Sequence, residues 1–249
     1  MISKNQLKYI HSLEQKKYRR RENAFVAEGP KVVGELIDAR FEPQQIFATE
    51  DWAGIHRNLD VHVVSEEELQ RMSFLQHPQQ VLAAFRLPDS KSIQTTGLCL
   101  ALDGIQDPGN MGTIIRIADW FGIQNIYCSE DTVDAWSPKV VQATMGSIAR
   151  VNIIYTSLEQ LIRQSAVPVY GTLLDGNDLY EETLSSEGII VMGNEGNGIS
   201  PDIRNLVTRR LLIPKYHEGP ESLNVAVATA IVCAEFRRQE RTSCMTTAG

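Results

Sequence analysis

Residues 97–121, "GLCLALDGIQDPGNMGTIIRIADWF", contain the pattern that decides the fold. A nearly continuous apolar run comes first, as is typical of a parallel strand that is covered on both faces. A loop rich in Gly, Pro, Asn and Asp follows, and after it Ile114, Ile117, Ala118 and Phe121 recur at the spacing of a helix with one buried stripe. A strand, a loop and a helix in this order form the repeating unit of an α/β fold.

The same alternation continues through the second half of the chain. Five more apolar runs are predicted strands: "NIYCS" (125–129), "RVNIIY" (150–155), "VPVYGTLL" (167–174), "GIIVM" (188–192) and "RRLLIP" (209–214). One side of the predicted last helix is apolar and rich in alanine, which permits close approach of a partner helix: Leu223, Val227, Ala230, Ile231 and Ala234. The polar tail from Glu240 onward is expected to fray. We predict a parallel sheet with helices on both faces.

The first half reads as a smaller α/β sandwich in front of this sheet. The predicted strands are "FVAEG" (25–29), "QIFAT" (45–49), "VHVV" (61–64) and "QVLAAFRL" (80–87), with helices expected in 29–40 and 65–72. Ser65 and Glu68 form a capping-box pattern at the start of the second helix. Because residues 87–97 resemble a linker, we expect two domains, 1–88 and 97–240.

The composition is that of an ordinary globular protein. Of 249 residues, 43% are hydrophobic and 22% charged, and no apolar stretch approaches the ~18 residues of a membrane span. The first residues lack the apolar core and cleavage site of a signal peptide. We therefore expect a cytoplasmic protein with no membrane partner.

Several familiar chemistries lack their motifs in this chain. The four cysteines form no CxxC pair and the five histidines form no HExxH motif, so no metal is expected. The glycine-rich loops contain neither the GxGxxG of a dinucleotide fold nor the lysine of a Walker loop, and no GxSxG precedes a helix. A nucleotide-binding oxidoreductase is therefore a distant alternative.

One basic cluster stands out from the net charge of −7. Residues 1–30 hold seven Lys and Arg against three Glu, and most of the basic residues fall in "KKYRRR": Lys16, Lys17, Arg19, Arg20 and Arg21. Such a run is either a solvated helix or loop face or a patch that contacts nucleic-acid phosphates. The sequence alone leaves both interpretations open.

Three loops of the second half are candidates for a ligand site. Residues 103–112, 193–200 and 214–224 follow predicted strands, and ligands of parallel sheets collect beyond the carboxyl ends of strands. A purely structural interpretation also exists, in which the glycines of "GNEGNGIS" provide positive φ angles before a helix capped by Ser200 and Pro201. Asn110 and Ser222 would then be helix caps, and Arg116 a surface arginine.

The three loops resemble the motifs of a known family. "NMGTIIRIA" (110–118) is similar to the first motif, N-x-G-x-x-x-R-x-A, of the SpoU/TrmH family of RNA ribose methyltransferases. "IVMGNEGNGIS" (190–200) resembles its second motif and "LLIPKYHEGPESLNVAVATA" (211–230) its third. "FVAEGPKVVGELI" (25–37) is similar to the ribosomal-protein-like substrate-binding domain that many members carry in front.

The resemblance implies a function and a fold that periodicity does not predict. The function is transfer of a methyl group from S-adenosylmethionine to a ribose 2′-hydroxyl of structured RNA, with ribosomal RNA favoured over transfer RNA because of the front domain. The fold is the SPOUT fold, whose C-terminal segment forms a deep trefoil knot, and the active form is a homodimer packed through the knot helices. The alternatives are a transfer-RNA enzyme and a non-catalytic RNA-binding or ribosome-assembly protein.

The resemblance also implies roles for individual residues. Arg116 matches the catalytic arginine, and four polar residues surround it: Asn110, Glu195, Ser222 and Asn224. The positions expected to contact the cofactor are Thr172, Gly193, Ile213 and Leu223. Because an arginine side chain stays protonated in proteins, we expect Arg116 to hold the RNA phosphate and stabilise a developing alkoxide. The RNA is expected to bind the "KKYRRR" cluster of the front domain.

Two places depart from the family pattern. "KYHEGPE" (215–221) is about one residue longer and more polar than usual, which leaves the roles of His217 and Glu218 open. "ADWFG" (118–122) is bulkier than the usual small-residue stretch, and we expect Trp120 to be a packing residue.

Overall fold

The computed structural model describes residues 1–89, 92–217 and 222–246, the side chains only as far as residue 242. These residues form two compact units. The first unit comprises residues 1–89 together with 134–149, and the second comprises the other described residues. The chain therefore leaves the second unit after Val133 and returns to it at Arg150. The predicted domain boundaries, 1–88 and 97–240, remain a prediction.

The first unit is built on a four-stranded sheet with the order β1-β4-β2-β3. Its strands are β1 (Ala24–Glu28), β2 (Pro43–Ala48), β3 (His62–Val63) and β4 (Val81–Arg86). Strand β4 runs antiparallel to both β1 and β2, whereas β2 and β3 are parallel. The four strands predicted from the sequence are thus confirmed, and they form a mixed sheet.

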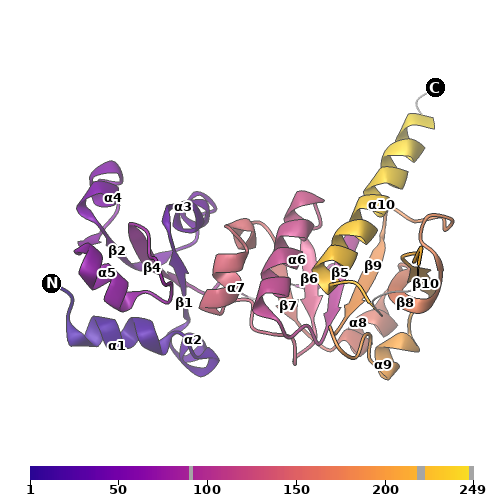
Figure 1. The fold of residues 1–249 in the computed structure, drawn as a ribbon, viewed down its shortest axis with the longest axis horizontal. Helices are drawn as coiled ribbons and strands as arrows, with labels where there is room; N and C mark the ends of the chain where they lie inside the picture. Colours follow the sequence, from indigo (N-terminus) through magenta and orange to yellow (C-terminus); the bar gives the residue numbers. More distant parts are fainter. Residues whose placement is uncertain (90–91, 218–221, 247–249) are drawn as a thin grey trace. The chain divides into compact units, whose positions relative to one another are not determined.

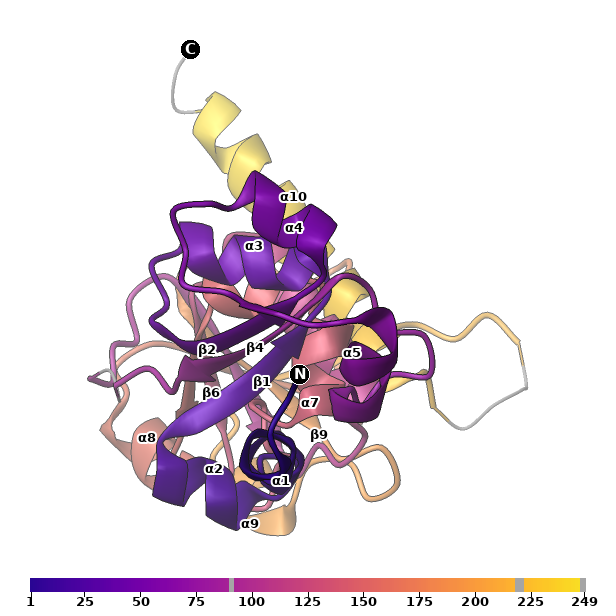
Figure 2. The ribbon, with the colours of Figure 1, turned by 90° about the vertical axis from the view of Figure 1, so that its left-hand side faces the viewer.

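Five helices of the first unit cover this sheet. They are α1 (Lys4–Ser12), α2 (Lys16–Glu22), α3 (Pro30–Asp38), α4 (Glu50–Ile55) and α5 (Glu66–Met72). Figure 2 shows α3 and α4 on one side of the sheet and α1 and α2 on the other. Ser65 and Glu68 form the predicted capping box at α5, and helices α1, α2 and α4 were not predicted. The later segment with α7 (Pro138–Ala143) and the 3-10 turn Ser147–Ala149 packs against β1 and α3.

The second unit contains the predicted parallel sheet. Its order is β10-β8-β9-β5-β6-β7, and every neighbouring pair is parallel. The strands are β5 (Leu98–Asp103), β6 (Asn125–Cys128), β7 (Asn152–Tyr155), β8 (Val169–Asp178), β9 (Gly188–Gly193) and β10 (Arg209–Leu212). Strands β5, β6 and β9 are buried along their whole length, which explains their unbroken apolar sequence.

Helices cover both faces of this sheet, as predicted. Helices α8 (Leu158–Gln164) and α9 (Pro201–Arg204) share a core cluster with Ala101 and Val191. Their neighbours in the strands, Leu100 and Ile190, point to the opposite face because side chains alternate along a strand. Helices α6 (Pro108–Trp120) and α10 (Val225–Thr246) lie side by side, and α10 contacts β9 (Figure 1).

Two predictions about these helices are wrong. Trp120 is 85% exposed, because it lies with Thr113 and Arg116 on the side of α6 opposite the buried Ile114 and Ala118. The tail also does not fray from Glu240, since α10 continues to Thr246. The trefoil knot remains a prediction, because the third motif includes residues 218–221, which lie outside the described part of the chain. Over that described part, no helix is both long and apolar enough to cross a membrane.

Candidate functional site at the carboxyl edge of the sheet

The loops after β5 and β9 meet at one edge of the sheet. Asp103 and Gly193 are paired at the carboxyl ends of their strands, so the residues after them emerge together. The side-chain amide of Asn194 donates a hydrogen bond to the carbonyl of Gly104 at 2.6 Å. The backbone N–H of Ser200 donates to Asp103 Oδ2 at 2.7 Å. The end of β5 and the start of the loop that leads into the first motif are therefore joined to both ends of the 194–200 loop.

Glu195 is the centre of a hydrogen-bond network at this edge. Its Oε1 accepts from the backbone N–H of Asp107 at 3.2 Å and from Asn110 Nδ2 at 3.0 Å, and its Oε2 accepts from the N–H of Gln106 at 3.2 Å. Partial burial alone would raise the pKa of Glu195, but these hydrogen bonds outweigh burial and hold its pKa below the ordinary value. The carboxylate is ionised at neutral pH and holds residues 104–107, here called the first-motif loop because they lead into the first motif, in place.

Asn110 connects Glu195 to the third motif. Its Oδ1 accepts from Asn224 Nδ2 at 2.9 Å, while its Nδ2 donates to Glu195. Asn224 in turn accepts from the N–H groups of Ala226 and Val227 at 3.0 and 3.2 Å, and so caps the start of α10. The amide of Asn110 therefore has one orientation in this network, and an aspartate there would face the Glu195 carboxylate.

Arg116 and Ser222 lie outside this network. Arg116 follows Asn110 by less than two turns of α6, is exposed, and has no hydrogen-bond or ion-pair partner among the described residues. Ser222 is exposed as well, two residues before the cap of α10. The structure thus brings together Asn110, Glu195 and Asn224 of the five predicted catalytic residues. It leaves the Arg116 guanidinium available for a substrate anion.

The glycines of the second motif serve the loop itself. A side chain on Gly193 would lie 2.2 Å from the carbonyl carbon of Gly198 and 2.3 Å from the nitrogen of Ile199. Gly198 has φ +69°, which favours glycine. The positive φ predicted for the loop glycines is therefore confirmed at Gly198 and is wrong at Gly193 and Gly196; at Gly193 the missing side chain instead allows the loop to fold back on the strand.

The residues expected at the cofactor also lie toward this edge. Thr172 follows the part of β8 paired with β9, and its hydroxyl donates to the carbonyl of Val191 at 3.2 Å. Ile213 follows β10, and Leu223 precedes Asn224. Among the described residues, the backbone N–H and C=O groups of Ile213 and Leu223 have no hydrogen-bond partner. These positions suit a ligand that is recognised through backbone groups.

The basic cluster divides into two sets in the first unit. Lys17, Arg20 and Arg21 on α2 are exposed, and Lys16 is half-buried. Arg19 differs, because its side chain is 3% exposed and forms an ion pair with Asp134. This burial contradicts the prediction that Arg19 contacts RNA. Helix α2 packs on β1 with one of its sides, and the buried residue on that side is Arg19.

Sequence reasoning missed three residues of the network at the sheet edge. Asp107 caps α6 by accepting from the N–H of Asn110 at 2.7 Å, and Asp103 and Asn194 hold the second-motif loop. Only Asp107 had a readable signal, since an Asp before Pro is a typical helix start. His217 is exposed, whereas Glu218 lies outside the described residues. No group of three His, Cys, Asp or Glu side chains that could hold a metal occurs in the described part.

Comparison with known proteins places the chain in a family. Residues 97–234 match the SpoU rRNA Methylase family, and residues 4–83 match the MRM3-like substrate binding domain. The chain is 30% identical over 243 residues to the 23S rRNA (guanosine(2553)-2′-O)-methyltransferase RlmP of Bacillus subtilis, with 94% of this chain and 97% of that protein covered.

Solved structures agree over almost the full length. A TrmH-family protein from Porphyromonas gingivalis has a TM-score of 0.88 and 43% identity, covering 96% of this chain and 99% of that one. An rRNA methyltransferase from Sinorhizobium meliloti, solved with bound AdoMet, has a TM-score of 0.85 and 31% identity, with 96% of each chain covered. With its three motifs joined at the carboxyl edge of a parallel sheet, the chain belongs to the SpoU rRNA methylase family.

Proposed function

We propose that the protein transfers a methyl group from S-adenosylmethionine to a ribose 2′-hydroxyl of ribosomal RNA. The observation that carries this proposal is the network from Asn224 through Asn110 to Glu195, with the exposed Arg116 on the same helix as Asn110. The relative from Bacillus subtilis is named as a 2′-O-methyltransferase of 23S rRNA, and the front domain matches a substrate-binding domain. Both support ribosomal over transfer RNA, and cytoplasmic location remains our expectation.

The residues at the sheet edge fit S-adenosylmethionine. When bound, this cofactor supplies a methyl group on a positively charged sulfur that is open to attack by an oxygen nucleophile. The residues that would hold it are Thr172, Gly193, Ile213 and Leu223. The backbone groups of Ile213 and Leu223, which bond to none of the described residues, are donors and acceptors of the kind that an adenine and a ribose require. Gly193 belongs to this set because it has no side chain and so allows the 194–200 loop to fold back on β9.

Arg116 is proposed to bind and orient the RNA. Its guanidinium can donate to a phosphate beside the target ribose and can stabilise negative charge that develops on the 2′-oxygen. In-line transfer depends on this orientation, which supplies a large part of the rate. Glu195 is proposed as a positioning residue, because its lowered pKa makes it a weak base and both its oxygens already accept hydrogen bonds.

We further propose that the protein is a homodimer through α6 and α10. The predicted apolar side of α10 is open to solvent in the single chain, where Val227 is 50% exposed and Ala234 is exposed, with Ala230 and Ile231 half-buried. The exposed Trp120 lies on the neighbouring helix. Apolar side chains in such an arrangement are typical of a surface that a second protein copy covers.

The experiment that tests this function is incubation of the protein with labelled S-adenosylmethionine and purified ribosomal and transfer RNAs. We expect label on a ribose of ribosomal RNA, and label on transfer RNA alone would contradict the proposed substrate. Arg116→Ala should reduce methylation by at least about 100-fold, the usual effect of removing a transition-state donor. Its affinity for S-adenosylmethionine should stay within about threefold of the wild type, and a larger decrease would contradict the role given to Arg116.

The matched control for this variant is Arg163→Ala. Arg163 is an exposed arginine on α8 of the same unit, and it forms a surface ion pair with Glu159. Removal of a surface ion pair has little effect, so this variant should methylate RNA like the wild type.

A further inference from the structure

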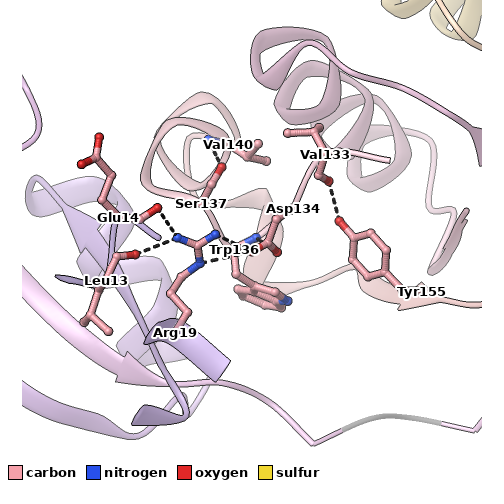
Figure 3. A network of polar contacts seen from close by, with 9 residues as sticks. All are labelled: Leu13, Glu14, Arg19, Val133, Asp134, Trp136, Ser137, Val140 and Tyr155. Atoms are coloured by element: carbon pink, nitrogen blue, oxygen red, sulfur yellow. Dashed lines mark hydrogen bonds and ion pairs between the residues drawn. The ribbon is translucent and has the colours of Figure 1, made fainter. Parts of the chain in front are cut away.

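Helix α2 has a basic outer side and one buried arginine. Arg19 Nε and Nη2 donate to Asp134 Oδ2 at 3.2 and 2.5 Å, and Nη1 donates to the carbonyls of Leu13 and Glu14 at 2.7 and 2.6 Å (Figure 3). The guanidinium thus fixes the turn between α1 and α2 and binds Asp134 with two donors. Both donors share one carboxylate oxygen, and the charges of the two side chains strengthen these hydrogen bonds.

Asp134 is held from its other side as well. Its Oδ1 accepts from the backbone N–H of Trp136 at 3.2 Å (Figure 3). The Trp136 ring lies 4.7 Å from the Phe25 ring of β1 and 6.3 Å from Phe41, measured between ring centres. The chain at residues 134–136 is therefore fixed to α2 and β1 by both charge and packing.

The residue before Asp134 belongs to the active-site edge of the second unit. The N–H of Val133 donates to the carbonyl of Ile105 at 2.8 Å, and its carbonyl accepts from the Tyr155 hydroxyl at 2.5 Å. The side-chain amide of Gln106 donates to the carbonyl of Asp131 at 2.7 Å. The 131–133 segment thus supports the first-motif loop at Ile105 and Gln106. The N–H groups of Gln106 and Asp107 in the same loop donate to Glu195.

Asp134 and Val133 are consecutive residues, so the contacts that hold Asp134 in the first unit end one peptide bond from the contacts that support the 105–107 loop in the second. We infer that Arg19 and Asp134 are positioning residues for methyl transfer, because they fix the chain next to Val133, whose contacts support the 105–107 loop beside Glu195. The inference rests on the proposed function, and it adds a role for two residues outside the three motifs.

The pair suits this role for an energetic reason. Both side chains are largely buried, and removal of one partner leaves the other charge without its counter-ion inside the protein. A variant that removes one of the two charges is therefore expected to lose the contact that fixes residues 134–136. The neighbouring side chains Lys17, Arg20 and Arg21 stay exposed on the same helix and remain available to RNA.

The test uses the full-length protein and Asp134→Asn, which keeps the shape and removes the charge. We expect kcat to fall by about tenfold while the affinity for RNA stays within about twofold, since coupling residues outside a site have effects of this order. Amide hydrogen exchange at residues 105–107 should become faster. Asp134→Glu, which restores the carboxylate, should recover part of kcat. If Asp134→Asn does not fold, Arg19→Lys replaces it, because it keeps the charge and removes the two-donor geometry.

The control is Asp38→Asn, the same change at an exposed position of α3 in the same unit. It should leave kcat, RNA affinity and exchange unchanged. Unchanged kcat and exchange in folded Asp134→Asn would overturn the inference, as would a decrease of RNA affinity with kcat intact. If the wild type methylates no RNA, the proposed function fails, and exchange at residues 105–107 still decides whether Asp134 controls the loop.

Discussion

At the scale of single residues, Glu195 shows how one charge can hold a loop in place. Its carboxylate accepts hydrogen bonds from two consecutive backbone N–H groups at the start of α6 and from Asn110. A carboxylate near the first turn of a helix is also favoured by the helix dipole. The first-motif loop therefore depends on the ionised form of Glu195.

This dependence predicts a pH effect. The lowered pKa means that the contribution of Glu195 to stability is complete above its ordinary pKa of 4.5 and is lost as the pH falls through its folded-state pKa. Glu195→Gln should therefore lower the free energy of unfolding at pH 7, and the difference from wild type should shrink at pH 3. Urea unfolding at both pH values measures this.

The control for the pH effect is Glu187→Gln. The carboxylate of the exposed Glu187 accepts no hydrogen bond from the described residues, so its replacement should change the free energy of unfolding little at either pH. A constant difference between wild type and Glu195→Gln from pH 7 to pH 3 would count against the anchoring role.

At the scale of elements, α10 combines two tasks on opposite sides. Its buried side, with Val232, Cys233 and Phe236, packs on the unit, and Asn224 joins its start to the first motif. Its other side carries the exposed Val227 and Ala234. Helix α10 packs beside α6, which carries Asn110 and Arg116. A protein that covers the exposed side of α10 therefore lies next to the helix that carries these two residues.

The dimer proposal predicts the effect of a charge on that side. Ala234→Glu would bury an unpaired carboxylate in the interface, so the dissociation constant of the dimer should rise by more than about tenfold. Sedimentation over a range of concentrations measures the change. Ala39→Glu, at an exposed position in the first unit, is the control and should sediment like wild type. A wild-type protein that sediments as a monomer would refute the proposal.

The sequence predicted helices and strands better than it predicted contacts between residues that are far apart in the chain. The strand and helix of residues 97–121 follow from local periodicity, and so does the capping box at Ser65. The hydrogen bond of Asn110 with Glu195 joins residues 85 positions apart; the order of strands predicted that their loops would share one edge of the sheet, but not that these two side chains would bond. The inward position of Arg19 could not be predicted, because α2 has basic residues on all sides and its periodicity gives no sign of the buried one.

At the scale of the whole molecule, the protein is acidic but has a local cluster of basic residues. The chain carries a net charge of −7, yet Lys16, Lys17, Arg20 and Arg21 are clustered on one short helix. A net negative charge does not attract RNA as a whole, so the proposed RNA contact on this basic helix would direct where RNA binds. This arrangement favours selective over indiscriminate binding.

The basic helix predicts a salt dependence. Replacement of Lys16, Lys17, Arg20 and Arg21 by alanine should weaken RNA binding and reduce the slope of log affinity against log salt by about 1 for each RNA phosphate that is no longer neutralised. Fluorescence anisotropy with labelled RNA at several salt concentrations measures the slope. Arg163→Ala should leave the slope unchanged. An unaltered slope in the four-residue variant would place the RNA on another surface.

The excursion of residues 134–149 into the first unit limits how this chain can be divided. The segment lies inside the region matched by the methylase family, but Trp136, Val140 and Val141 are covered by the first unit. A catalytic fragment that begins at the linker would lack β1 and α2, and these apolar side chains together with the Asp134 carboxylate would face water. Such a fragment is expected to aggregate, so recombination or truncation of this enzyme has to keep the front unit and the excursion together.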